Sequence, residues 1–220
     1  MKALILVDLQ NDFLPGSALP VPSGDAVIPV ANRVQRGFDL IVATQDWHPA
    51  NHGSFASNHP NRTTGEHGEL GGLPQVFWPV HCVQNSGGAA FAPGLETRRI
   101  TRVFPKGTDP EIDSYSGFFD NGHKKSTGLG DYLRERDVTV VYVLGLATDY
   151  CVKATALDAR QLGFDAHLIA DGCRGINLQA GDIDRAVAEM RAAGVHVIES
   201  TELVQPDTPT RLLNTRRESP

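Results

Sequence analysis

The sequence predicts an α/β fold, Rossmann-like, in which a largely parallel six-stranded sheet lies between two layers of helices. Short apolar runs rich in β-branched residues recur along the chain, and helical segments separate several of them, a pattern typical of βαβ units. The chain has 220 residues, of which 40% are hydrophobic and 21% charged. This composition is that of a globular protein able to bury one full core.

The expected strands are the runs in which apolar and β-branched residues follow one another without a turn signal. The first run, KALILV, ends at Asp8, and this charge comes too early for a signal peptide or a membrane span. It is therefore expected to form a buried strand. In chain order the six expected strands cover residues 2–7, 39–44, 100–104, 138–144, 164–169 and 195–198.

The expected helices lie between these strands, and glycines mark several of their ends. Ser23 is the expected N-cap of the first helix, because a serine side chain can accept a hydrogen bond from a free backbone N–H group. The four expected helices cover residues 24–36, 126–136, 150–162 and 182–193, with Gly37, Gly163 and Gly194 directly after three of them.

These elements indicate a single domain over residues 1–205. Residues 46–92 show little periodicity and are rich in Gly, Pro, His and Asn, and a long irregular segment inside a compact domain is usually functional. We expect it to form a metal-binding loop insertion. The last residues, 206–220, are polar and contain prolines, so they are expected to form a flexible tail without a catalytic part.

The net charge indicates which partners the protein can bind, and the cysteine content indicates its cellular compartment. The formal net charge is −6, and 20 basic residues are scattered among 26 acidic ones, which argues against nucleic acid as a partner. The three cysteines form no C-x-x-C pair and are odd in number, so a disulfide framework is not expected. We expect a cytoplasmic protein that binds a small molecule and no membrane, as a monomer or a homodimer.

Four reactive side chains follow the expected strands. Asp8 comes directly after the first strand, Asp46 after the second, Lys106 after the third and Cys151 after the fourth. The carboxyl ends of parallel strands meet at one edge of the sheet, where ligands of such folds bind. The four side chains are therefore expected to converge there.

Three of these residues suit nucleophilic catalysis. Cys151 is expected in the first turn of a helix, where the helix dipole and a neighbouring ammonium such as Lys106 would favour the thiolate. Burial of Asp8 would raise its pKa and suit it to take a proton and return it. Each has a plain structural alternative: a small buried thiol for Cys151, a turn cap for Asp8 and a solvated loop residue for Lys106.

Histidines and a carboxylate in the irregular segment indicate a metal site. Asp46 and His48 are two residues apart, so in extended backbone their side chains point the same way, and His81 would complete the site. Zinc, iron and manganese all accept such a set, and three protein ligands leave positions open for water or substrate. The alternative is a surface loop with several ordinary histidines.

With these residues and the motifs around them, the chain resembles the nicotinamidase/pyrazinamidase family of the isochorismatase-like cysteine hydrolases. Six motifs carry the resemblance over nearly the whole length, in the family's order: LILVDLQNDF, TQDWHP, WPVHCV, FPKG, DSYSGFFDN and GLATDYCVK. DLQNDF alone would indicate only the broader superfamily. The resemblance implies an isochorismatase-like fold and hydrolysis of nicotinamide, with pyrazinamide as a second substrate, to nicotinate and ammonia in NAD salvage.

The resemblance also assigns roles to residues. It implies one divalent metal ion, zinc first, with iron or manganese as alternatives. It implies a cis peptide between Leu146 and Ala147. Family members with a fourth protein ligand carry it at the position of Ser54, so three ligands and waters are expected here, and His52 is left out of the set. The implied site comprises the triad Asp8, Lys106 and Cys151, the metal ligands Asp46, His48 and His81, the ring walls Phe13, Trp78 and Tyr115, and the oxyanion donors Ala147 and Cys151.

Two alternative functions stay open on the sequence alone. Another amidohydrolase of the same fold would use the cysteine without needing to anchor a pyridine nitrogen. A non-catalytic metal-binding protein would leave Asp8 and Lys106 without a role.

Overall fold

A computed structural model describes residues 1–203, and the tail expected over 206–220 lies outside this range. Six parallel strands form the central sheet in the order β5-β2-β1-β6-β7-β8. Among residues 1–203, none of the helices has the length and apolar character needed to cross a bilayer. The strands are β1 (Lys2–Val7), β2 (Leu40–Asp46), β5 (Arg102–Lys106), β6 (Val140–Leu146), β7 (Asp165–Arg174) and β8 (His196–Ile198).

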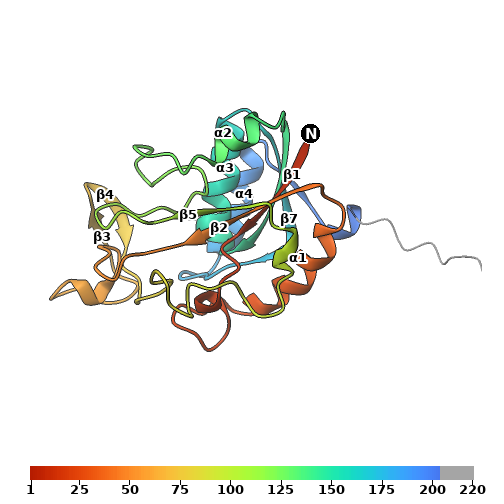
Figure 1. The fold of residues 1–220 in the computed structure, drawn as a ribbon. Coiled ribbons are helices and arrows are strands. Elements are labelled where there is room, and N and C mark those ends of the chain that lie inside the picture. The colour runs from red at the N-terminus through yellow and green to blue at the C-terminus, as the bar shows by residue number, and fades with distance from the viewer. Residues whose placement is uncertain (204–220) are drawn as a thin grey trace, which may run out of the picture.

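Helices cover both faces of the sheet, so the predicted three-layer α/β/α architecture is confirmed (Figure 1). The chain adds strands first on the β2 side of β1 and then on the β6 side. Because crossovers between parallel strands are right-handed, this change of direction places α1 on one face and the later helices on the other. The helices are α1 (Val27–Gln35), α2 (Leu129–Arg134), α3 (Lys153–Gln161) and α4 (Asp182–Ala192).

The six strands are those predicted, but several limits differ. β1 has the predicted limits, β5 and β6 begin and end two residues later, β2, β7 and β8 begin one residue later, and β7 extends five residues further than predicted. Apolar character set the predicted limits, whereas pairing with the neighbouring strand sets the observed ones. At β5 the pairing extends through Pro105 to Lys106, which is possible because an edge strand tolerates a proline. Asp46 and Lys106 are thereby register partners at the ends of neighbouring strands.

Three helix starts differ from the prediction. The helix expected over 126–136 is the shorter α2, which begins at Leu129, directly after Gly128 with a φ of 86°, and ends at Arg134. Ser23 does not cap the first helix: its φ is 55°, its side chain makes no capping hydrogen bond, and the chain enters α1 through a 3₁₀ turn over Gly24–Ala26. The helix expected from residue 150 begins as α3 at Lys153, after a π-helical turn over Thr148–Val152. Cys151 lies in this wider turn.

The irregular segment contains a hairpin that the sequence analysis missed. Strands β3 (His67–Leu70) and β4 (Leu73–Val76) pair antiparallel and form a separate sheet, which lies to the left of the main sheet in Figure 1. Gly71 and Gly72 connect them with φ values of 59° and 78°, the conformation that a tight hairpin turn requires. This Gly-Gly pair between short apolar runs was the available signal.

The core leads directly to one edge of the sheet. The residues of β1 after Lys2 are fully buried, and the chain stays buried at Asp8, the first residue beyond the strand. β1 and β6 are the two strands between which the strand order changes direction, the place where open α/β sheets bind ligands. Asp8 follows one of them and the turn with Cys151 follows the other.

Candidate active site and metal centre

Lys106, the last residue of β5, is the centre of the polar cluster at this edge. Its Nζ lies 2.9 Å from Asp8 Oδ2 and also forms an ion pair with the carboxylate of Asp46. It donates to the carbonyl of Ser114 at 2.8 Å and lies 3.4 Å from Cys151 Sγ. The structure therefore brings all four strand-end residues together, and Lys106 touches each of the other three.

Mutual charge and burial set the ionisation of this cluster. Burial alone lowers the pKa of Lys106, but the carboxylates of Asp46 and Asp8 outweigh burial and raise that pKa well above its usual value. At Asp46, burial raises the pKa, yet Lys106 and His48 bring it well below its usual range. Burial prevails at Asp8, whose pKa is raised although Lys106 opposes the shift. Asp8 is thus the carboxylate better suited to exchange a proton.

Asp8 is held rigidly at the end of β1. Its φ of 48° is unusual for a residue with a side chain, and Thr44 of β2 supports it twice. The Thr44 hydroxyl donates to Asp8 Oδ1 at 2.6 Å, and Thr44 Oγ1 accepts from the Asp8 backbone N–H at 3.2 Å. The other carboxylate oxygen of Asp8, Oδ2, faces Lys106. One carboxylate oxygen of Asp8, one of Asp46 and the sulfur of Cys151 all lie within 4.8 Å of one another.

Cys151 is a buried thiol in the π-helical turn. The N–H of Val152 bonds to the carbonyl of Ala147 at 3.1 Å, which makes the turn one residue wider than an α-helical one. Burial raises the pKa of the Cys151 thiol well above its usual value, and Lys106 offsets this only in part. The expected resting thiolate is therefore not what the structure favours: a base has to take the proton. The peptide Leu146–Ala147 is cis, as the resemblance implies.

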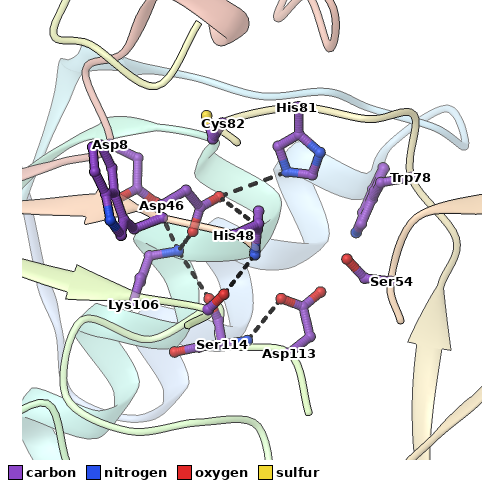
Figure 2. A network of polar contacts seen from close by, with 12 residues as sticks. Asp8, Asp46, His48, Ser54, Trp78, His81, Cys82, Lys106, Asp113 and Ser114 are labelled. Atoms are coloured by element: carbon purple, nitrogen blue, oxygen red, sulfur yellow. Dashed lines mark hydrogen bonds and ion pairs between the residues drawn. The ribbon is translucent and has the colours of Figure 1, made fainter. Parts of the chain in front are cut away.

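Asp46, His48 and His81 form a second, adjoining cluster around the same carboxylate. One Asp46 oxygen faces Lys106, while the other, Oδ2, lies 3.6 Å from His48 Nε2 and 3.7 Å from His81 Nε2. Figure 2 shows Lys106 and the two imidazoles arranged around this carboxylate. All three residues are buried.

The tautomers of the two histidines suit metal binding. His48 Nδ1 lies 2.8 Å from the carbonyl of Gly107, and His81 Nδ1 lies 2.8 Å from the carbonyl of Pro79. A carbonyl only accepts, so each Nδ1 carries a proton, and in a neutral ring the Nε2 atom then has the lone pair that a metal ion needs. Tetrahedral zinc places its ligand atoms roughly 3.3–3.5 Å apart, close to the spacing seen at Asp46 Oδ2. This donor set fits one divalent ion.

Three further polar residues adjoin the two imidazoles. The ring of His52 lies 4.3 Å from that of His48, and its Nδ1 is 2.7 Å from the Ser54 hydroxyl. Its Nε2 is buried without a hydrogen-bond partner among residues 1–203. Burial first, and then His48, lowers the pKa of His52 to about 4, so the ring is neutral. Asp113 joins this group as a possible ligand beside His48 and His52.

Gln10 is a supporting residue that the sequence analysis did not identify as part of the site. Its side chain accepts from the backbone N–H of Asp46 at 2.8 Å and donates to the Asp46 carbonyl at 2.9 Å. It also donates to the carbonyl of Ala89 at 2.9 Å. Gln10 thereby holds the end of β2 and the loop after His81 together. Its position in the LILVDLQNDF motif, two residues beyond Asp8, was the available signal.

The aromatic residues expected as ring walls line one pocket with the reactive groups. Phe13, Trp78 and Tyr115 surround it together with Cys151 and the Asp46 cluster. Trp78 Nε1 donates to the Tyr115 hydroxyl at 3.2 Å, which fixes both rings. Burial raises the pKa of Tyr115 well above its usual value, so its hydroxyl stays neutral.

Two more pocket residues were not among those predicted from the sequence, although one of them, Tyr150, lies in the GLATDYCVK motif. Tyr150 packs edge-on against Trp78, with ring centroids 4.9 Å apart, and Ile176 closes the same pocket. Asp149 connects them: its carboxylate accepts from the N–H groups of Ile176 at 3.0 Å and Asn177 at 2.7 Å. The turn that carries Cys151 is thus bonded to the pocket wall beyond β7.

Comparison with known proteins assigns the chain to a family. Residues 2–202 match the isochorismatase domain. The chain is 55% identical to the nicotinamidase of Escherichia coli (strain K12), over 88% of this chain and 92% of that protein. The chain belongs to the nicotinamidase/pyrazinamidase family of isochorismatase-like hydrolases. The family resemblance predicted from the six motifs is confirmed.

Solved structures of the family agree. A nicotinamidase/pyrazinamidase from Acinetobacter baumanii superposes with a TM-score of 0.90 at 45% identity, covering 92% of this chain and 98% of that one. A pyrazinamidase of Pyrococcus horikoshii in complex with zinc gives a TM-score of 0.73 at 42% identity, covering 90% and 98%. The predicted isochorismatase-like fold is therefore confirmed, and a family member of similar fold binds zinc.

The protonation of Cys151 can be tested by alkylation. Because burial raises the pKa of the thiol above its usual value, the rate of its modification by iodoacetamide should keep rising with pH through pH 9. Peptide mass spectrometry measures the rate at Cys151 alone. A rate that levels off below about pH 8 would show an activated resting thiolate instead.

The orientation of His48 can be tested at Gly107. An alanine Cβ there would lie 2.3 Å from His48 Cε1, and Gly107 has a φ of 62°. Gly107→Ala should push the imidazole aside and weaken zinc binding at the Asp46 cluster by at least about tenfold, measured by competition with a chromophoric chelator. Gly94→Ala is the control, because Gly94 has a similar φ of 84° but open space around it. Equal zinc affinity in both variants would contradict the prediction.

Proposed function

We propose that this protein hydrolyses nicotinamide to nicotinate and ammonia through a thioester on Cys151. The observation that carries the proposal is the position of Lys106, which contacts Asp8 and Cys151 on one side and the carboxylate of Asp46 on the other. Cys151 and the Asp46 cluster line the same pocket as the aromatic residues. Relatives that the chain matches over most of its length are named nicotinamidases. A non-catalytic metal-binding protein would have no use for a buried thiol beside a buried acid.

Asp46, His48 and His81 would hold one divalent ion in this enzyme. Zinc is the first choice, because the pyrazinamidase of P. horikoshii was solved with zinc, and the same donors accept iron and manganese. When bound, the ion offers an open coordination position to the ring nitrogen of a pyridine. Phe13, Trp78 and Tyr115 would enclose the ring and exclude water.

The first chemical step transfers the acyl group to sulfur. Asp8 accepts the thiol proton of Cys151, and the sulfur attacks the carboxamide carbon. The electrons of the C=O double bond move to its oxygen, which receives hydrogen bonds from the backbone N–H groups of Ala147 and Cys151. The C–N bond then breaks, and the departing nitrogen takes the proton from Asp8 to leave as ammonia. The product is a nicotinoyl thioester.

The second step returns the enzyme to its starting state. A water molecule gives a proton to Asp8 and adds to the thioester carbon. The C–S bond breaks, and the sulfur recovers the proton from Asp8. The product is nicotinic acid, which loses its carboxyl proton to water and leaves as nicotinate. Lys106 keeps Asp8 ionised between proton transfers and stabilises the sulfur while it carries negative charge, because its Nζ reaches both groups.

The same chemistry extends to related carboxamides. Pyrazinamide keeps a ring nitrogen in the position that nicotinamide uses, so we expect it to be a second substrate. We further propose that the nicotinate enters NAD salvage in the cytoplasm and that the enzyme works as a monomer or a homodimer.

Ammonia release from purified protein tests the proposal directly. Nicotinamide should yield ammonia, a chelator should suppress the release by removing the ion, and zinc, iron or manganese should restore it. A coupled ammonia assay with pyrazinamide and benzamide alongside measures this. Benzamide, which lacks a ring nitrogen, is expected to react poorly. Equal turnover of benzamide would remove the case for a metal anchor, and no release with any metal would refute the proposed activity.

Cys151→Ala separates chemistry from ring binding. Turnover should fall by at least about 10³-fold because the nucleophile is gone, whereas nicotinate affinity, measured by calorimetry, should change little. Cys173→Ala is the matched control, since it removes a buried thiol from β7. Normal turnover in the Cys151 variant would refute the nucleophile assignment.

A further inference from the structure

A second group of metal-ligand side chains lies at the opposite end of the sheet from the active site. Asp165 is the first residue of β7 and His196 the first of β8, whereas the reactive cluster follows the carboxyl ends of the strands. Asp165 and His167 are two residues apart on one strand, so they share a face. His196 is the register partner of His167 on the neighbouring parallel strand and shares it too.

The geometry points to a second binding site for a divalent transition-metal ion, formed by Asp165, His167 and His196. His167 Nε2 lies 3.3 Å from Asp165 Oδ2, and His196 Nε2 lies 3.3 Å from Asp165 Oδ1. The three residues place their ligand atoms within 4.8 Å of one another. Ligands of a tetrahedral zinc ion are roughly 3.3–3.5 Å apart, so each imidazole lies at ligand spacing from the oxygen of Asp165 that it faces.

Packing holds one of the three ligands, His167, in place before an ion arrives. The His167 ring is stacked between Tyr142, at 4.6 Å between centroids, and His196, at 4.8 Å. The other ring nitrogen, Nδ1, is buried and has no hydrogen-bond partner in the described part of the chain. Nε2 is the nitrogen that faces Asp165. A preorganised imidazole loses less conformational freedom on binding than a mobile surface histidine.

The donor set selects the class of ion. Two imidazoles and one carboxylate favour zinc, nickel or copper over calcium and magnesium, which prefer sets made entirely of oxygen. The His196 side chain is 61% exposed, so water can complete the coordination sphere. Arg160 opposes the ion, because its Nη1 lies 3.7 Å from Asp165 Oδ1. We therefore expect weaker binding here than at the buried Asp46 cluster.

The experiment counts zinc ions on the enzyme and locates the weaker one. Wild-type protein that already holds one equivalent of zinc is titrated with more zinc by calorimetry. A second equivalent should bind, and His196→Ala should weaken it by at least about tenfold. Hydrolysis of nicotinamide should be unchanged in this variant before the second equivalent is added, because His196 lies outside the active site. This readout is independent of the proposed function.

A matched control distinguishes a built site from any histidine beside a carboxylate. His123 is 48% exposed and faces Asp158 at 3.2 Å, so His123→Ala removes a comparable pair and should leave the second equivalent in place. One equivalent only in the wild type would overturn the proposal. So would a second equivalent that binds equally well to wild type and His196→Ala, and so would one that is weakened as much by His123→Ala.

Discussion

A single buried ammonium group, shared by two carboxylates, is the interaction on which the whole site depends. The carboxylates of Asp46 and Asp8 outweigh the burial of Lys106 and raise its pKa, and Lys106 in turn is the largest influence that lowers the pKa of Asp46. The parallel register of β2 and β5 makes this pairing possible, since it sets Asp46 and Lys106 side by side at the sheet edge. The sheet register therefore determines which charged side chains form the ion pair of the site.

The strands and the convergence of reactive residues could be predicted because both follow from simple periodicity. A parallel sheet turns every strand end to one edge, so Asp8, Asp46, Lys106 and Cys151 had to meet once the strands were recognised. Strand limits were harder, since pairing with a neighbour, as at Pro105 and Lys106, extends a strand beyond its apolar run. Two of the helix starts were predicted wrongly because a 3₁₀ turn and a π turn replace the regular α-helical beginnings.

What the sequence could not provide was the balance of burial against charge. Cys151 looked like an activated thiolate when only the helix end and Lys106 were considered, but complete burial reverses the sign of the pKa shift. The sequence also does not show that the two oxygens of Asp46 have different partners: one faces Lys106, and the other faces the two imidazoles. Tyr150 neighbours Cys151 in the chain, but its packing against Trp78 and the place of Ile176 in the pocket depend on segments distant in the chain.

The two oxygens of Asp46 also constrain how this protein can evolve. A descendant that kept the thiol chemistry but gave up the metal could discard His48 and His81 and still keep both carboxylates beside Lys106. It could not discard Asp46 in the same way, because the ammonium would lose one of its two counter-charges. A carboxylate at this position can therefore outlive the ion it once bound, and its presence in a distant homologue is weak evidence of metal dependence.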